Sequence, residues 1–298
     1  MANNVDKLTV KYIAEASQQQ IALETGEVDG FVGITQNLIS SFEGSGFEVS
    51  ALPSIGGMVT RFSGDGSRIV AEDANLRKAI AYAIDEQGII QGVYGGYAQV
   101  MHGTDPVGPI GYQEAWLKND NYNYDVEKAK EYLAQSNYNG ETLELLASSS
   151  TINDRIGAMI QAYLLEIGID LKLNIVERSL YTAMTYDGTA YDMIIMNPGG
   201  TDLAGLWYNS YNMYAYEGGD ASGRHDEILT NMLIKTSTNS GFTTENIEAV
   251  YQYLRENMYD YGICQPQQAD IYSANINMIE RVPMIGGGLD FAACVYGN

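Results

Sequence analysis

The residues best suited to binding chemistry lie between Asn197 and Trp207, just past a short apolar run of the chain. Asp202 can form a charge-assisted bond to an ammonium group, and Trp207 can stack on a ligand side chain or a sugar ring. Asn197 and Gly199 can present an amide and bare backbone groups to the same ligand. Two other interpretations stay open, because Asp202 also suits a turn or a helix cap and Trp207 also suits the apolar face of a helix.

Two further segments carry candidate binding groups. Tyr97 and His102 lie in a loop-like stretch that also holds two prolines, and a histidine in such a stretch fits a plain surface position as well. Gln265, Gln267 and Gln268 form a polar run within a strand-like pattern. Neutral amides suit the recognition of hydroxyl or peptide groups, and an edge strand facing water explains the same run equally well.

Signals for catalysis or for a metal are weak. The histidines His102 and His225 stand without a neighbouring nucleophile or metal-ligand motif. The carboxylates are so numerous that pairing any two as acid and base would be arbitrary. No CxxC or Cys/His spacing indicates zinc, and the run Asn119–Asp125 lacks the glycine of a calcium loop. We therefore expect no enzyme, no metal and no cofactor, with a carboxylate-based hydrolase as the alternative.

The composition restricts the partners. Acidic residues outnumber basic ones 38 to 16 among 298 residues, which gives a net charge of -22. This charge argues against nucleic acid and anionic membrane surfaces, because phosphate binding needs clustered lysine and arginine. The 23 tyrosines, against 6 phenylalanines and 2 tryptophans, suit either an exposed cleft or the core.

Features tied to cellular location are few. No apolar run of about 18 residues is present, so no transmembrane helix is predicted. The start of the chain lacks the charged and apolar regions of a signal peptide and runs directly into a predicted strand at 8–13, which indicates a trimmed N-terminus. Cys264 and Cys294 permit one disulfide, whose presence the sequence does not decide.

The elements that must position these groups follow an α/β order. Met193–Met196 has the pattern of a short buried strand, so the candidate loop begins where a strand ends, a common place for ligands. Helix 152–167, Gly168 and the alternating strand 169–176 form one helix–strand unit of such a layer. Further helices are predicted over residues 17–25, 37–42, 73–84, 85–94, 125–133, 179–186, 226–235 and 244–259, and further strands over 28–34, 49–52, 58–62, 143–147 and from 263 onward.

The order of these motifs resembles a known family. The segment Asp73–Asp85 resembles the signature of bacterial family 5 extracellular solute-binding proteins, which are the oligopeptide- and dipeptide-binding components of ABC importers. Tyr124–Leu133 resembles the family's next helix opening, with Val126 where proline is usual. The resemblance covers nearly the whole chain and extends to Ala22–Asp29, Gly95-Gly96-Tyr97, Glu166–Ile169 and Tyr191-Asp192-Met193.

The resemblance implies an α/β lobe of the type II periplasmic-binding-protein fold, together with part of the first lobe's mixed sheet. Residues 1–66 would belong to lobe I, 67–275 would form lobe II, the ligand-binding lobe, and 276–298 would return to lobe I. Family members carry a lipoprotein signal and a longer N-terminal part, so the sequence resembles the C-terminal portion of such a protein. We expect these residues alone to bind ligand weakly, because half of the cleft would be absent.

The resemblance also implies a function. A small peptide or similar solute would be held at the lobe interface and delivered to an ABC permease, by a monomer in the periplasm or on the outer face of the cell membrane. The family's ammonium-binding aspartate matches Asp202, and the loop with Tyr97 and His102 faces the cleft in relatives. Asn197 stands where a tryptophan is usual and one extra residue precedes Asp202, so a non-peptide solute such as an oligosaccharide stays an alternative. A signalling receptor built on the same lobes is a third possibility.

Overall fold

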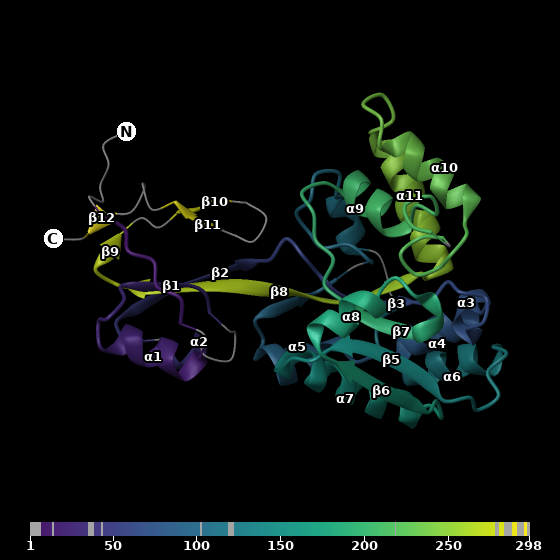
Figure 1. Ribbon diagram of the computed structural model, residues 1–298, viewed down its shortest axis with the longest axis horizontal. Helices are drawn as coiled ribbons and strands as arrows, with labels where there is room; N and C mark the ends of the chain where they lie inside the picture. Colours follow the sequence, from purple (N-terminus) through teal and green to yellow (C-terminus); the bar gives the residue numbers. More distant parts are fainter. Residues whose placement is uncertain are drawn as a thin grey trace.

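One long strand organises the molecule (Figure 1). The computed structural model describes residues 7–13, 15–34, 39–42, 44–101, 103–118, 122–217, 219–277, 280–282, 288–290 and 295–296. The long strand, β8 (Asp260–Ser273), pairs near its start with β3 (Met58–Phe62) and β4 (Ala98–Val100). Toward its end it pairs with β1 (Gly30–Ile34) and β2 (Phe47–Pro53). It therefore joins two regions, a small N-terminal one and a larger one.

The larger region is built on a mixed sheet. Its strands run in the order β8, β3, β7 (Met193–Met196), β5 (Leu143–Ser148) and β6 (Leu171–Val176). β5 is parallel to both β6 and β7, whereas β3 is antiparallel to β7 and β8. The predicted helix–strand unit is confirmed, because α7 (Thr151–Glu166) connects the parallel strands β5 and β6. Gly168 has a φ of 88° where that helix turns into the strand.

Capped helices cover one face of this sheet. Asp73, Asp85 and Asp125, the first residues of three predicted helices, are N-caps, since each carboxylate accepts a backbone N–H from the first turn of its helix. Apolar side chains of these helices and of the strands form the sheet core, which includes Phe62, Ile80, Ile160 and Ile195. The helices around the sheet, in addition to α7, are α3 (Ile69–Glu72), α4 (Ala74–Ala83), α5 (Glu86–Tyr94), α6 (Val126–Ala134) and α8 (Arg178–Met184).

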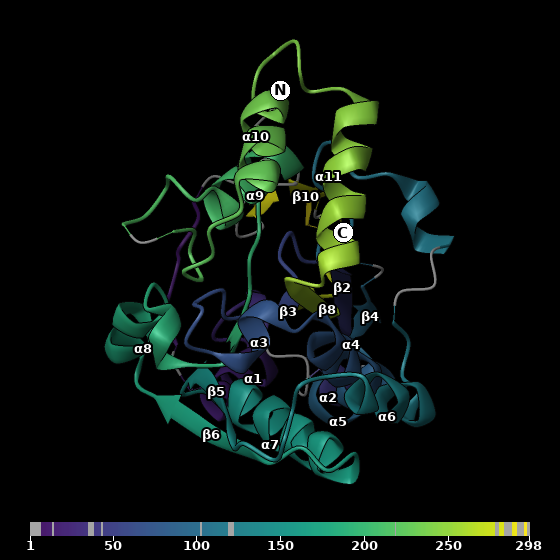
Figure 2. The same ribbon diagram turned by 90° about the vertical axis from the view of Figure 1, so that its right-hand side faces the viewer.

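A second group of helices stands on the opposite side of β3 and β8 from α4–α7 (Figures 1 and 2). It has its own apolar interior, the helical core, which includes Trp116, Trp207, Leu229 and Tyr251. Thr243 caps α11, since its side-chain oxygen accepts the N–H of Asn246. The group consists of α9 (Leu203–Tyr211), α10 (Glu227–Thr236) and α11 (Thr244–Asn257), with the 3₁₀ helix Glu114–Lys118 alongside.

The N-terminal region packs two helices against β1, β2 and the end of β8. Their apolar residues form the N-terminal core of Leu23, Ile34, Ile39, Phe42, Ala269 and Ile271. The strand predicted at 8–13 is wrong: those residues have no regular secondary structure and are mostly exposed, because no described strand pairs with them. The remaining elements are α1 (Ala16–Glu24), α2 (Ile39–Phe42), β9 (Ile276–Asn277) paired with β12 (Val295–Tyr296), and β10 (Glu280–Val282) paired with β11 (Gly288–Asp290).

Among the described residues, the chain passes between the two regions at two places. Met58 packs in the sheet core and Ala269 in the N-terminal core, so the crossings lie between β2 and β3 and along β8. The lobe boundaries at residues 66 and 275 stay a prediction. Cys264 is buried in the sheet core, whereas Cys294 lies outside the described residues, as does His102. Within the described part of the chain, no helix combines the length and apolar character that a membrane span requires.

Candidate functional site

The loop that follows β7 contacts the crossing between β2 and β3. Gly199 forms an isolated antiparallel bridge with Gly56, and the N–H of Gly57 donates to the carbonyl of Pro198 at 3.0 Å. A Cβ added to Gly199 would lie 3.0 Å from the Cα of Gly56, so any larger residue would crowd this backbone approach. Asn197 is exposed beside this contact. Two of the predicted site residues therefore lie where the two regions of the molecule meet.

Asp202 begins α9 and is half-buried. Its Oδ1 accepts the N–H of Gly205 at 2.7 Å, which makes it the helix N-cap. Among the described residues, none donates a hydrogen bond to its second oxygen, Oδ2. The backbone on either side is tied to Ile110, whose N–H donates to Thr201 at 2.8 Å and whose carbonyl accepts from Leu203 at 3.0 Å. One oxygen thus holds the helix and the other can accept a ligand cation.

Trp207 lies within the helical core, with 0% of its surface exposed. Its indole N–H donates to Oδ1 of Asp105 at 2.8 Å. Both faces of the ring are covered in this structure, so contact with a ligand would require α9 to move. The structure therefore shows Trp207 on the apolar face of a helix, which is one of the two roles that the sequence left open. Its contact with a ligand stays a prediction.

Tyr97 is half-buried and packs against the N-terminal core. Its carbonyl accepts the N–H of Gln267 on β8 at 3.0 Å. The strand β4 begins directly after it, so a segment predicted as loop in fact extends the sheet at β8. Tyr97 therefore lies at the junction of the two regions. It packs against the N-terminal core, whereas Trp207 packs in the helical core.

Gln265, in the polar run on β8, bonds to other parts of the chain. Its side chain is completely buried, and the N–H of Val107 donates to its Oε1 at 3.0 Å while its own Nε2 donates to the carbonyl of Val107 at 2.9 Å. Gln99 also donates to Oε1, at 2.8 Å. The amide thus binds backbone groups, as its chemistry suggested, but they are the N–H and the carbonyl of Val107 in the chain itself. Gln267 and Gln268 are half-buried on the same strand.

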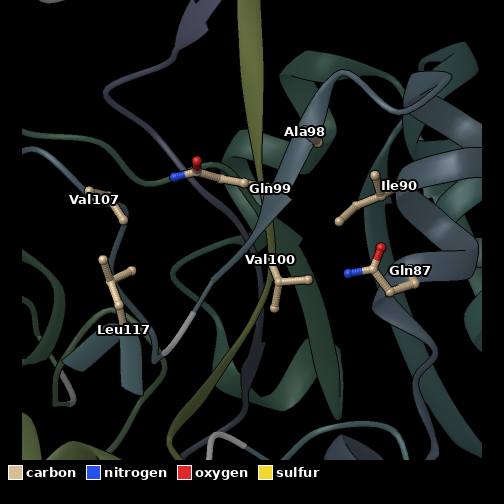
Figure 3. Close-up of a pocket in the computed structure, with 7 residues that line it drawn as sticks. All are labelled: Gln87, Ile90, Ala98, Gln99, Val100, Val107 and Leu117. Carbon is tan, nitrogen blue, oxygen red and sulfur yellow. The ribbon is translucent and has the colours of Figure 1, made fainter. Parts of the chain in front are cut away.

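A pocket of about 400 Å³ surrounds β4 (Figure 3). Val107 and Leu117 lie on one side of the strand, and Ile90 and Gln87 of α5 lie on the other. Its lining is mostly apolar with two amides, Gln87 and Gln99, and contains no acid or base. Such a lining suits an apolar or amide-bearing group and offers no group for proton transfer.

A larger, polar pocket of about 660 Å³ lies at the far end of the sheet and includes His225. Its two buried arginines donate to backbone carbonyls, Arg77 to Asn257 at 2.8 Å and Arg224 to Ser63 at 3.2 Å. Burial, with repulsion from Arg224, lowers the pKa of Arg77 to about 10. Asp226 caps α10 and accepts the hydroxyl of Tyr259 at 2.7 Å. Arg77, Arg224 and Asp226 of this pocket are therefore engaged by other groups of the chain.

Two buried carboxylates approach each other between the sheet core and the helical core. Asp260 makes a bidentate ion pair with Arg61, at 2.9 and 2.8 Å, and accepts the hydroxyl of Tyr211 at 2.7 Å. Burial raises the pKa of Asp105, the neighbouring acid, to about 7. Neither acid lines either of the two pockets described above, and both are buried, with 3% of Asp105 and 2% of Asp260 exposed. Among the described residues, no group of three or more His, Cys, Asp or Glu side chains is arranged to hold a metal.

Comparison with known proteins shows the family to which this chain belongs. The family model described as bacterial extracellular solute-binding proteins, family 5 Middle, matches residues 2–221. The chain belongs to the bacterial extracellular solute-binding proteins, family 5. The family 5 chain is 25% identical, over 299 aligned residues, to a probable D,D-dipeptide-binding periplasmic protein of Escherichia coli K12; the alignment covers 94% of this chain and 55% of that relative.

Solved structures share the fold of this family 5 chain. A putative peptide-binding protein AppA from Clostridium difficile superposes with a TM-score of 0.82 at 17% identity, covering 96% of this chain and 60% of the other. DppA from Helicobacter pylori, solved with the peptide STSA, gives 0.76 at 22% identity, covering 96% and 56%. The predicted type II periplasmic-binding-protein fold is confirmed. The family 5 chain spans about half the length of the curated relative, 55%.

Sequence reasoning missed the groups that hold the site together. No sequence pattern marked Asp105 or Ile110 as part of the site. Their hydrogen-bond partners, on α9 and just before it, lie about a hundred residues further along the chain. Gln265 was marked as unusual by its polar neighbours, and only the fold shows that it binds Val107.

Proposed function

We propose that this chain binds a small peptide, or a solute like it, outside the cytoplasm for import by an ABC permease. Its membership of family 5 supports a solute-binding role rather than an enzymatic one. The names of its relatives, a D,D-dipeptide-binding periplasmic protein among them, support peptides as the ligand class. The proposed location is the periplasm or the outer face of the cell membrane, and the proposed form is a monomer.

The convergence of three segments at the crossing of the two regions carries this proposal. The bridges from Gly56 to Gly199 and from Ile110 to Asp202 bring the β2–β3 crossing, the loop after β7 and the loop after β4 to one place. A ligand bound there would touch both regions, as closure about β8 requires. We take residues 1–66 and 276–298 as parts of lobe I and residues 67–275 as lobe II, with β3 as the part of the first range that packs in the sheet core of the larger region.

The proposed contacts follow from the chemistry of the converging residues. Oδ2 of Asp202 accepts the ligand's ammonium group, and exposed Asn197 and the backbone at Gly199 bind its peptide groups. Tyr97, His102 and Trp207 complete the proposed set. For Trp207 the proposed contact requires movement of α9, since its ring is covered in this structure.

Calorimetry of the full-length gene product with short peptides and with oligosaccharides tests the proposal. We expect saturable binding of peptides, together with a smaller radius of gyration in solution scattering as the lobes close. Binding of oligosaccharides in place of peptides would establish the alternative ligand class. Failure of every peptide to bind would overturn the proposal, and binding without compaction would overturn the placement of the ligand between the lobes.

A further inference from the structure

Asp105 occupies the boundary between the sheet core and the helical core with 3% of its surface exposed. It lies in the stretch 103–111, here called the connecting loop. Its Oδ1 accepts the indole N–H of Trp207 at 2.8 Å, and Thr104 Oγ1 lies 3.0 Å from its Oδ2. An indole can only donate, whereas a hydroxyl can donate or accept. Thr104 donates to Oδ2 of the ionised carboxylate, and its hydroxyl can turn to accept from the neutral acid, so both protonation states keep both partners.

Burial and the neighbouring charge of Asp260 favour the neutral form of Asp105. Arg61 is the nearby cation, and Asp260 already engages it through a bidentate pair. Among the residues that the structure describes, no lysine, arginine or histidine lies within 4.0 Å of the Asp105 carboxylate. An ionised carboxylate without a cation is costly in such surroundings. The groups facing it are Arg61 on β3, Tyr112 beyond the connecting loop, Tyr211 on α9 and Asp260 on β8, while Tyr251 of α11 packs on Gly103.

An asparagine would make the same contacts. Its carbonyl oxygen would accept from Trp207, and its amide would donate to the hydroxyl of Thr104, at nearly the same volume. Packing and hydrogen bonding therefore do not explain an ionisable group at this position. What the carboxyl adds is a response to pH, since burial raises its pKa to about 7.

The connecting loop joins this acid to the proposed ligand site. Ile110 is bonded to Thr201 and Leu203 on either side of Asp202, and Val107 is bonded to Gln265 on β8. Trp207 adds a third attachment, through Asp105 to the middle of α9. A change in the packing of Asp105 therefore acts on the helix that Asp202 begins.

We propose that Asp105 is a positioning residue whose proton keeps the connecting loop packed against α9, and whose ionisation, as pH rises, loosens α9 and the loop at Asp202. The charged form gains water when this contact opens, so the open state becomes more populated as pH rises. The effect on ligand affinity rests on the proposed function, whereas the change in packing does not. Binding of a solute would weaken in alkaline medium.

Trp207 itself reports on this packing. In a Trp116→Phe background it is the one remaining tryptophan of the two in the chain. We expect its fluorescence to show a transition centred near neutral pH, which Asp105→Asn abolishes. Asp187→Asn, at an exposed acid that caps a 3₁₀ turn, serves as the matched control and should leave the transition in place. A parent protein without the transition, or an Asp105→Asn variant that keeps it, would overturn the proposal.

Hydrogen exchange of α9 supplies a second readout. After correction for intrinsic rates, and relative to α7, its amides should exchange about tenfold faster at about pH 8 than at about pH 6 in the parent protein. In Asp105→Asn the ratio should not change with pH. A fluorescence transition with unchanged exchange of α9 would also overturn the positioning role. Neither measurement uses a ligand, so a failure of peptides to bind would count against the proposed function alone.

Discussion

Gln265 and Val107 form a two-way hydrogen-bonded pair in the interior of the molecule. The N–H of Val107 donates to Oε1 of Gln265 at 3.0 Å, and Nε2 of Gln265 donates to the carbonyl of Val107 at 2.9 Å. Nε2 also donates to the carbonyl of Ser54 at the crossing between the two regions. One buried amide on β8 thus bonds to the connecting loop as a paired strand would. The same amide also bonds to the chain where it crosses between the two regions.

Replacing Gln265 by alanine should destabilise the protein strongly. The substitution leaves the N–H and carbonyl of Val107 and the carbonyl of Ser54 without partners, and it opens a cavity. We expect the free energy of unfolding to fall by about 3 kcal/mol, measured by urea denaturation. Gln267→Ala, at a half-buried position on the same strand, is the control and should cost less. Equal losses would show that the pairing with Val107 carries no special weight.

Asp260→Asn should be more damaging than most single substitutions. It leaves the guanidinium of Arg61 buried without its counter-ion, and the hydroxyl of Tyr211 loses its charged acceptor. We expect a loss of about 3–5 kcal/mol in the free energy of unfolding. Glu27→Gln removes an exposed ion pair with Lys11 and should change stability by less than about 1 kcal/mol. Similar values for both variants in urea denaturation would contradict the structural role assigned to Arg61 and Asp260.

Asp105→Asn should stabilise the protein, and increasingly so as pH rises. Burial raises the pKa of Asp105 to about 7 in the folded protein. The ordinary value for aspartate, about 3.9, applies to the unfolded chain. As pH rises, Asp105 therefore loses its proton at a lower pH in the unfolded chain than in the folded protein. The free energy of unfolding falls over this interval, and the fall ends once the pH exceeds the pKa of Asp105 in the folded protein.

We expect the difference in unfolding free energy between Asp105→Asn and the parent protein to grow by about 2 kcal/mol from about pH 5 to about pH 8. Urea denaturation at both pH values measures it. A difference that stays constant would mean that Asp105 titrates alike in the folded and unfolded chain.

The two roles of Asp202 can be separated by the choice of substitution. Asparagine caps a helix about as well as aspartate, whereas alanine does not. Since Oδ1 accepts the N–H of Gly205 at 2.7 Å, we expect Asp202→Ala to cost about 1 kcal/mol and Asp202→Asn to cost little. Circular dichroism during thermal unfolding measures both. Equal stability of the alanine variant and the parent would show that the cap contributes nothing, and the asparagine variant is the one suited to binding studies.

Local signals predicted much of the fold. The bounds of the strands 58–62 and 193–196 agree with β3 and β7, because the first directly follows Gly56-Gly57 and the second is a short apolar run that ends just before Asn197-Pro198. The caps Asp73, Asp85 and Asp125 depend only on residues within one turn. The same local reasoning named Asp202 as a possible helix cap. The helix α9 itself was not predicted, because glycines surround its start.

Long-range contacts decide what the sequence could not. Residues 8–13 alternate like a strand, but a strand needs a neighbour and none of the described strands supplies one. Trp207 had two equally good interpretations until the fold placed Asp105 opposite its indole N–H. The polar run on β8 likewise suited either solvent or a ligand, and Gln265 instead meets the backbone of a loop at Val107.

The most direct test of the central claim is a calorimetric cycle on the full-length gene product and its Asp202→Asn variant. Each protein is titrated with a short peptide and with the same peptide N-acetylated. We expect acetylation alone and the substitution alone each to weaken binding by tenfold or more, and the two together to weaken it little further, because both remove one ammonium–carboxylate contact. Unchanged affinity of the variant for the free peptide would contradict the assignment of Asp202 to ligand capture.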